Sequence, residues 1–229
     1  MDYSNIYMQV EKSIVQVLCG RIDKDSLQMD SSGTGFIIDD GKKVLTCKHC
    51  VDKMKDNVIK VNDDLILVNN ISLSHDKDLA ILEFNQVIGM PLTLLKNNTL
   101  KIGNEIFTVG YPYTFNSNKT LVVGNVATFE SGLIKIDCSV NNGNSGGPLF
   151  NINGEVVGVI STKLGRFSQY LESVMNAKQQ VSINVGGIDP VETIQKLIKE
   201  MQQNLNLGIG YAIKSDDVIS DFGIINNIK

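Results

Sequence analysis

The chain has 229 residues, of which 42% are hydrophobic and 20% charged, a composition typical of globular proteins rather than disordered or fibrous chains. Its net charge of −4 argues against nucleic acid or an anionic membrane as the main partner, because both attract basic surfaces. No apolar run approaches the roughly 20 residues that a membrane-spanning helix needs. These numbers favour a soluble protein of one large domain or two small ones.

The first residues, MDYSNIYMQVEKSIVQ, lack the basic start, the apolar stretch and the small-residue cleavage site of a secretory signal. We therefore expect a cytoplasmic protein. Because thiols inside cells stay mostly reduced, we also expect all the cysteines to be free. The four are Cys19, Cys47, Cys50 and Cys138.

Short β-type runs recur along the chain and are separated by Gly, Asn and Asp. In chain order they are 14–19, 35–39, 43–47, 65–68, 79–84, 105–110, 120–129, 133–140 and 156–161. Many short strands at this spacing predict an all-β protein built as an antiparallel barrel or sandwich. The runs before residue 86 and after about residue 100 form two similar sets, so we expect one barrel over 1–86 and a second over 87–229.

The β pattern breaks between residues 163 and 207, where the sequence becomes polar and helical. Asp189 is predicted to cap a helix, with Pro190 in its first turn and Glu192 reaching back to the cap. One face of this helix is apolar and comprises Val191, Ile194, Leu197, Ile198 and Met201. We also expect a second helix over 167–178 and a short C-terminal helix in SDDVISDF.

Ser145 lies in the glycine-rich segment NGNSGGPL, where the backbone can turn tightly and direct several amides at one point. The segment Gly143, Asn144 and Ser145 is therefore a candidate oxyanion hole, with the amides of Gly143 and Ser145 as donors to the tetrahedral intermediate of acyl transfer. The alternative is a glycine-rich turn with a passive serine.

The order of residues restricts the type of serine catalysis. In α/β-hydrolases the histidine follows the serine, and no histidine follows Ser145. The subtilisin order would need a parallel α/β sheet, which the short strands do not suggest. The order His, Asp, Ser remains, with His49 as general base for Ser145. Taken alone, His49 would be read as a surface residue at a strand end.

Asp78 stands directly before the apolar run LAILEF and is the candidate for orienting the imidazole of His49. Its alternative reading is a solvated turn residue. His75 and Asp76 belong to the same turn, and we expect both to be exposed.

Five segments in order resemble the motifs of trypsin-like serine proteases, and most of all the HtrA/Deg branch. They are GTGFIIDDGKKVLTCKHC, HDKDLAILEF, KIGNEIFTVGYP, NNGNSGGPLFNINGEVVGVIS and GIGYAI. The resemblance covers about 10–220 apart from 163–207. It implies two six-stranded antiparallel barrels with the active site between them, and a serine endopeptidase that forms an acyl-enzyme on Ser145.

The chain departs from the family pattern at several places. We expect it to work without the PDZ domains usual in the HtrA branch. The stretch 33–35 lacks the cysteine that pairs with the equivalent of Cys50 in secreted enzymes. Asn144 stands where zymogens carry an Asp, so activation by N-terminal cleavage is not expected.

The resemblance also implies a substrate site. Ser161, Thr162 and Lys163 would pair with the substrate backbone. Ser139 would form the pocket floor without the carboxylate that binds basic side chains, and Ile209 would narrow the pocket. We therefore expect cleavage after small or medium aliphatic residues, with attraction of acidic residues by Lys163 as the alternative.

Two further classes of site are weak in this sequence. Cys47 and Cys50 have half the spacing of a zinc site, but the other cysteines are distant, so we expect no metal. No nucleotide-binding loop is present, and no cofactor is expected. The partner is a protein or peptide substrate. An alternative function is a latent protease-fold subunit whose insertion 163–207 docks a regulatory protein.

Overall fold

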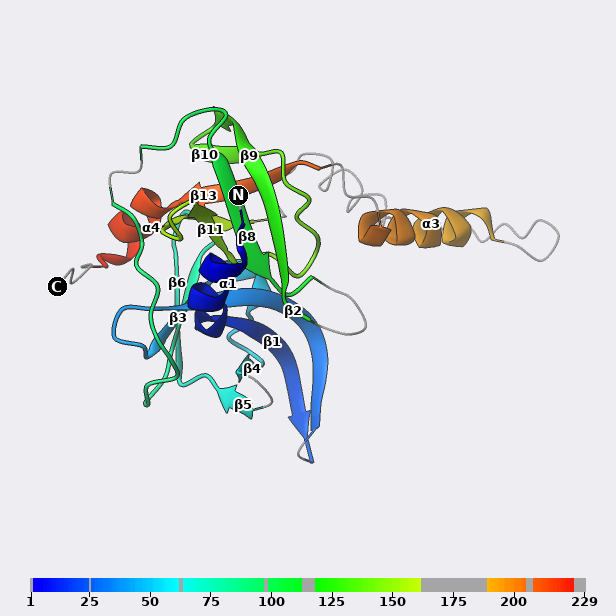
Figure 1. The fold of residues 1–229 in the computed structure, drawn as a ribbon. Helices are drawn as coiled ribbons and strands as arrows, with labels where there is room; N and C mark the ends of the chain where they lie inside the picture. Colours follow the sequence, from blue (N-terminus) through cyan, green and yellow to red (C-terminus); the bar gives the residue numbers. More distant parts are fainter. Residues whose placement is uncertain are drawn as a thin grey trace.

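A computed structural model describes residues 2–24, 26–61, 64–96, 99–112, 118–161, 189–204 and 208–224. Within these ranges the chain is mostly β, and its strands form two sheets that lie one above the other (Figure 1). The predicted all-β fold class is therefore confirmed. The division of the chain at residue 86 into two barrels stays a prediction.

The first sheet contains seven strands in the order β5-β4-β1-β2-β3-β7-β6. Their bounds are β1 Ile14–Asp23, β2 Ser26–Ile38, β3 Lys43–Thr46, β4 Asp56–Val61, β5 Asp64–Leu67, β6 Asn70–Leu73 and β7 Ala80–Glu83. The resemblance implied a six-stranded barrel, whereas this sheet has seven strands with β5 and β6 as its edges. The link between the edge strands explains the difference, because the Val68 amide donates to Asn57 of β4 and the Asn69 amide to Glu83 of β7. β5 therefore remains paired with β4, and β6 with β7, and the two edge strands do not pair with each other.

The second sheet closes into a six-stranded barrel in the order β10-β13-β12-β11-β8-β9. Its strands are β8 Glu105–Gly110, β9 Thr120–Glu130, β10 Leu133–Ile136, β11 Pro148–Asn151, β12 Val156–Ile160 and β13 Gly210–Lys214. All neighbouring strands pair antiparallel, as predicted.

The N-terminal residues pack on the second barrel. Helix α1 (Ser4–Val10) and the 3₁₀ turn η1 (Glu11–Ser13) precede β1. The ring of Tyr3, just before α1, lies 5.1 Å from that of Phe107, which in turn stacks on Phe150 at 4.7 Å. Burial of these aromatic side chains ties the start of the chain to β8 and β11.

The helix predicted to begin at Asp189 lies at the predicted position. Helix α3 (Pro190–Asn204) begins where the sequence indicates, and the Asp189 carboxylate accepts from the amides of Val191 at 2.9 Å and Glu192 at 3.2 Å. Figure 1 shows α3 projecting away from the two sheets. The predicted helix 167–178, and the side chains of Ile198 and Met201, fall outside the described part of the chain.

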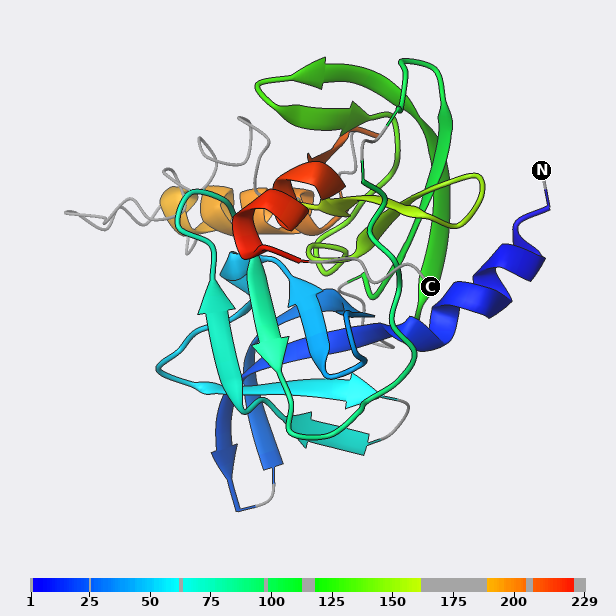
Figure 2. The same cartoon turned by 90° about the vertical axis from the view of Figure 1, so that its left-hand side faces the viewer.

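The C-terminal helix α4 (Ser215–Phe222) is confirmed. It follows β13 directly and reaches the turn between β6 and β7 of the first sheet, where Asp217 pairs with Lys77 at 3.4 Å (Figure 2). Among the described residues, no helix is both long and apolar enough to cross a membrane.

Candidate active site

His49 and Asp78 form a doubly bonded pair. His49 lies in the 3₁₀ turn η2 (Lys48–Cys50) after β3, and Asp78 lies just before β7. The Nδ1 atom of His49 is 2.6 Å from Asp78 Oδ2, and the backbone amide of His49 donates to Asp78 Oδ1 at 3.0 Å. Because both the ring and the backbone are held, the orientation of the imidazole is fixed by one carboxylate.

Ser161 adds a third donor to this carboxylate. It follows β12 of the second barrel, is fully buried, and donates from Oγ to Asp78 Oδ2 at 2.9 Å. Its backbone amide donates to the carbonyl of Tyr211 at 2.9 Å, which anchors it between β12 and β13. The sequence predicted Ser161 only as a partner for substrate backbone, so this side-chain contact across the two sheets was missed.

Burial and hydrogen bonding act in opposite directions on the pKa of Asp78. Burial raises the pKa of this carboxyl, but the hydrogen bonds from the ring and the backbone of His49 and from Ser161 outweigh burial and hold the pKa below its ordinary value. Asp78 is thus ionised at neutral pH, and its carboxylate accepts a hydrogen bond from the protonated Nδ1 of His49. The other ring nitrogen of the neutral imidazole is then the one with a free lone pair.

Ser145 lies in a tight loop between β10 and β11 and is only 2% exposed. Glycines on either side adopt left-handed backbone, with φ of +96° at Gly143 and +86° at Gly146. The Gly147 amide donates to the carbonyl of Asn144 at 3.0 Å. Since N–H and C=O of a trans peptide point in opposite directions, this bond directs the amide of Ser145 away from the turn.

The serine loop is seated against the first sheet. The carbonyl of Ser145 accepts from the amide of Thr34 at 2.8 Å and from the thiol of Cys50 at 3.7 Å. Cys50 directly follows His49, so this contact places the serine loop beside the turn that carries the imidazole. A Cβ atom at Gly146 would lie 2.1 Å from the carbonyl oxygen of Thr34, so only glycine fits at this approach.

The predicted pocket residues are brought together only in part. Ile136 at the end of β10 pairs with Gly210 at the start of β13. Ser139 therefore follows one of these neighbouring strands and Ile209 precedes the other; Ser139 is exposed and Ile209 is 49% exposed. Thr162 and Lys163 lie outside the described residues.

Cys47, His49 and Asp78 have potential ligand atoms within 4.8 Å of one another. Burial raises the pKa of the Cys47 thiol well above its usual value, and Cys47 donates to the carbonyl of Ile160 at 3.2 Å. Zinc binds the thiolate form of cysteine, which this environment disfavours. That this cluster holds no metal remains a prediction.

All four cysteines are free and buried. The position that faces Cys50 in the neighbouring strand is Gly33, where a Cβ atom would lie 2.5 Å from the sulfur. β2 therefore packs its backbone at Gly33 closely against the Cys50 sulfur, at the position where a disulfide partner would stand.

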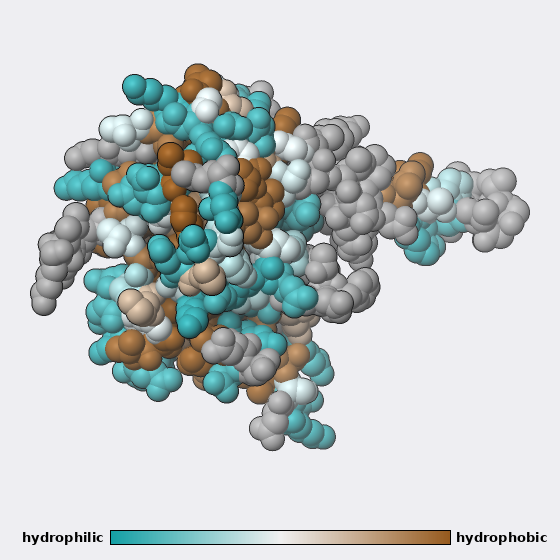
Figure 3. Space-filling view, in the orientation of Figure 1, coloured by the Kyte–Doolittle hydropathy of each residue, from teal (hydrophilic) through white to brown (hydrophobic). Residues whose placement is uncertain are grey.

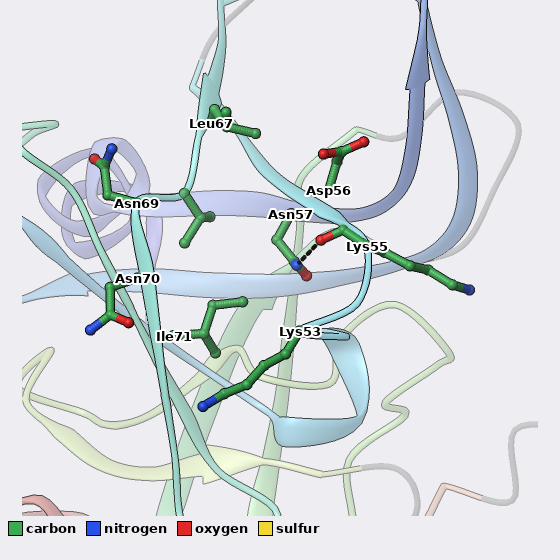
Figure 4. Close-up of a pocket in the computed structure, with 9 residues that line it drawn as sticks. Lys53, Lys55, Asp56, Asn57, Leu67, Asn69, Asn70 and Ile71 are labelled. Atoms are coloured by element: carbon green, nitrogen blue, oxygen red, sulfur yellow. Dashed lines mark hydrogen bonds between the residues drawn. The ribbon is translucent and has the colours of Figure 1, made fainter.

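The described part of the first sheet carries a cavity beside His49 and another, smaller cavity. The larger, of about 590 Å³, is bordered by His49 together with Lys48, Val51 and Leu73, and so opens beside the imidazole. The smaller, of about 320 Å³, lies in the seam between β5 and β6 (Figure 4). None of the residues predicted for the site lines the smaller cavity.

Comparison with known proteins agrees with this geometry. The sequence profile of the trypsin-like peptidase domain matches residues 33–159, more than half of the chain. A probable periplasmic serine endoprotease, DegP-like, of Hahella chejuensis is 34% identical over 154 residues, which cover 61% of this chain and 32% of that protein. The serine endoprotease DegS of Salmonella typhimurium is 31% identical over 147 residues, covering 59% of this chain and 40% of that protein. The chain thus matches between about a third and two fifths of the length of these relatives.

The crystal structure of the serine endoprotease from Yersinia pestis superposes with a TM-score of 0.68 at 21% identity. The superposition covers 97% of this chain and 66% of that chain, and it shows a shared fold. Several matching relatives are named periplasmic, which contradicts the cytoplasmic location predicted from the N-terminal residues. By sequence profile and by fold, the chain belongs to the trypsin-like peptidase domain family.

Proposed function

We propose that this protein is a serine endopeptidase with Ser145 as nucleophile and His49 as general base. Asp78 orients the imidazole of His49 and stabilises the positive charge that the ring acquires during the reaction. The observation that carries the proposal is the doubly bonded pair, in which Nδ1 of His49 lies 2.6 Å from the carboxylate of Asp78. Such a pair leaves the second ring nitrogen free to accept a proton, which is what a serine hydroxyl needs to attack at neutral pH. Its family relatives named serine endoproteases support the same activity, and their names point to the periplasm as its compartment.

In the proposed reaction, Oγ of Ser145 attacks the carbonyl carbon of the substrate while His49 takes the hydroxyl proton. The amides of Gly143 and Ser145, on either side of Asn144, stabilise the oxyanion. The C–N bond then breaks, the leaving amine takes the proton from His49, and an acyl-enzyme remains on Ser145. Water, deprotonated by His49, releases the acyl group by the same steps in reverse.

Labelling with a fluorophosphonate tests this proposal, because only a serine activated by an aligned base reacts quickly with the reagent. We expect rapid labelling at Ser145, loss of labelling in His49→Ala, and unchanged labelling in His75→Ala. His75 is the matched control, since its side chain is 96% exposed and pairs with the neighbouring Asp76, away from Asp78. Absence of labelling in the folded wild type would instead indicate the latent, partner-binding subunit.

The substrates are proposed to be proteins or peptides cleaved after small or medium aliphatic residues. Ser139 lacks a charge that binds Lys or Arg, and Ile209 narrows the pocket. Digestion of a peptide library, read by mass spectrometry, is expected to show Val, Ala, Ile, Leu or Thr before the cleaved bond. Ser139→Asp is expected to raise cleavage after Lys and Arg about tenfold, with Ser139→Asn as the neutral control. A dominant signal for Lys, Arg, Asp or Glu in the wild type would refute this preference.

The insertion 163–207 is proposed to regulate access to the site or to dock a regulatory protein. It starts two residues after the buried Ser161, whose hydroxyl donates to Asp78, and it ends shortly before β13. The described residues on its two sides are neighbours, because the Ser161 amide donates to the carbonyl of Tyr211 in β13. Three apolar side chains of α3, Val191, Ile194 and Leu197, are 38%, 51% and 55% exposed, and Figure 3 shows apolar surface on the projecting helix.

Replacing 167–205 by a short Gly/Ser linker is therefore expected to change the cleavage rate severalfold or to shift substrate preference. Circular dichroism establishes that the shortened protein folds. The triple variant Val191→Ser, Ile194→Ser, Leu197→Ser tests the helix face alone. If the shortened protein kept the wild-type cleavage rate, substrate preference and partner binding, the insertion would have no regulatory role.

A further inference from the structure

Thr34 lies at the point where the first sheet meets the serine loop. It is a fully buried residue of β2, where it pairs with Gln16 of β1. Its carbonyl accepts from the hydroxyl of Thr46, on β3, at 2.7 Å. The carbonyl of Thr34 is thus held within its own sheet.

The other hydrogen bonds of Thr34 all reach the second barrel. Its amide donates to the carbonyl of Ser145 at 2.8 Å, and its hydroxyl donates to the carbonyl of Gly143 at 2.7 Å. The same hydroxyl accepts from the amide of Tyr111, just after β8, at 2.9 Å. One side chain therefore bridges the serine loop and the end of a neighbouring strand.

We propose that Thr34 is a positioning residue for the oxyanion hole, acting through its hydroxyl on the peptide unit that follows Gly143. This inference rests on the proposed peptidase function. The two carbonyls that Thr34 holds lie on either side of Asn144, and the carbonyl of Asn144 is held by the Gly147 amide. Three successive carbonyls of the loop are thus anchored, which fixes the direction of the Ser145 amide between them.

The anchoring matters because an oxyanion donor stabilises the transition state only when it is already oriented before the reaction. Gly143 is buried, so loss of the Thr34 hydroxyl would leave its carbonyl without this donor in a site that is closed to bulk solvent. The loop already carries one buried acceptor, Oδ1 of Asn144, that has no hydrogen-bond partner among the described residues. A second unsatisfied acceptor beside it favours rotation of the peptide unit toward another donor, which would turn the loop out of its catalytic shape.

Thr34→Val tests this role, because it keeps the shape of the side chain and replaces the hydroxyl by a methyl group, which neither donates to Gly143 nor accepts from Tyr111. We expect kcat for a peptide substrate to fall about 10- to 100-fold, somewhat less than the loss of a whole oxyanion donor, with KM within about twofold of the wild type. Affinity for a peptide boronic acid, whose tetrahedral adduct places an oxygen in the oxyanion hole, should fall in parallel. The pH midpoint of kcat should not move, because Thr34 does not contact His49.

Thr108→Val is the matched control. Thr108 is also buried, and its hydroxyl donates to the carbonyl of Pro148 at 2.8 Å, outside the serine loop. We expect this variant to keep the wild-type kcat and boronic acid affinity. Thr34→Ser, which retains the hydroxyl, should recover most of the activity lost in Thr34→Val.

If Thr34→Val fails to fold, the ratio of kcat between Thr34→Ser and Thr34→Ala isolates the hydroxyl, and a ratio near one would overturn the inference. So would wild-type kcat and boronic acid affinity in folded Thr34→Val. A wild type that neither cleaves peptides nor reacts with fluorophosphonate would overturn the proposed function itself, so the two failures are distinguishable.

Discussion

Replacing Ser145 by alanine is expected to lower kcat for peptide hydrolysis about 10⁶-fold, as in other serine peptidases that lose their nucleophile. The variant loses one oxygen atom and no backbone contact. The carbonyl of residue 145 still accepts from the Thr34 amide, and the carbonyl of Asn144 still accepts from the Gly147 amide. The fold and the melting temperature should therefore stay close to those of the wild type.

The measurement is a progress curve with a peptide substrate, combined with fluorophosphonate labelling of the same preparations. Ser26→Ala serves as control, since Ser26 is an exposed residue at the start of β2 whose hydroxyl donates to the nearby carbonyl of Asp23. Turnover by Ser145→Ala near the wild-type level, with contaminating proteases excluded, would falsify the proposed nucleophile.

The elements that local sequence determines were predictable. The spacing of short apolar runs predicted an all-β fold, because alternation along a strand is a property of the strand itself. Asp189 predicted the start of α3, because a capping carboxylate acts on the amides two and three residues along the chain. The candidate pair of His49 and Asp78 followed from a chain with only two histidines, and the structure brings these side chains together.

The features that depend on distant contacts were not predictable. The seven-stranded arrangement of the first sheet depends on where the amides of Val68 and Asn69 find acceptors, on strands 11 and 14 residues away in the chain. The side-chain role of Ser161 depends on its burial against a carboxylate 83 residues earlier. Its only signal in the sequence is a hydroxyl at the end of the apolar run VVGVIS, which does not name a partner.

Thr34 shows the same limit. In the sequence it reads as one polar residue between two glycines in a strand, and that local pattern does not indicate which residues its hydroxyl contacts. Its contacts with Gly143 and Ser145 span more than 100 residues. The prediction of a cytoplasmic location was wrong for a different reason. It was inferred from the N-terminal residues alone, whereas relatives that match the peptidase domain are named periplasmic.

Asp78→Asn is expected to lower kcat about 10⁴-fold at neutral pH while the protein stays folded. Three donors point at the Asp78 carboxylate: the backbone amide of His49, its ring Nδ1, and the hydroxyl of Ser161. Asparagine offers one acceptor oxygen and an NH₂ group. The backbone amide of His49 can only donate, so the asparagine oxygen must face it, and the NH₂ group then faces Nδ1.

An imidazole that accepts at Nδ1 carries its proton on Nε2, and it then has no lone pair with which to take the proton of Ser145. The defect is thus a wrong tautomer rather than a lost contact. Asp76→Asn is the matched control, because Asp76 lies 2.6 Å from Nδ1 of His75 in an equally short pair whose side chains are 96% and 81% exposed. We expect Asp76→Asn to keep wild-type kcat and pH dependence. If the two variants retained equal activity in a peptide assay, Asp78 would not orient the catalytic base, and the proposed triad would be wrong.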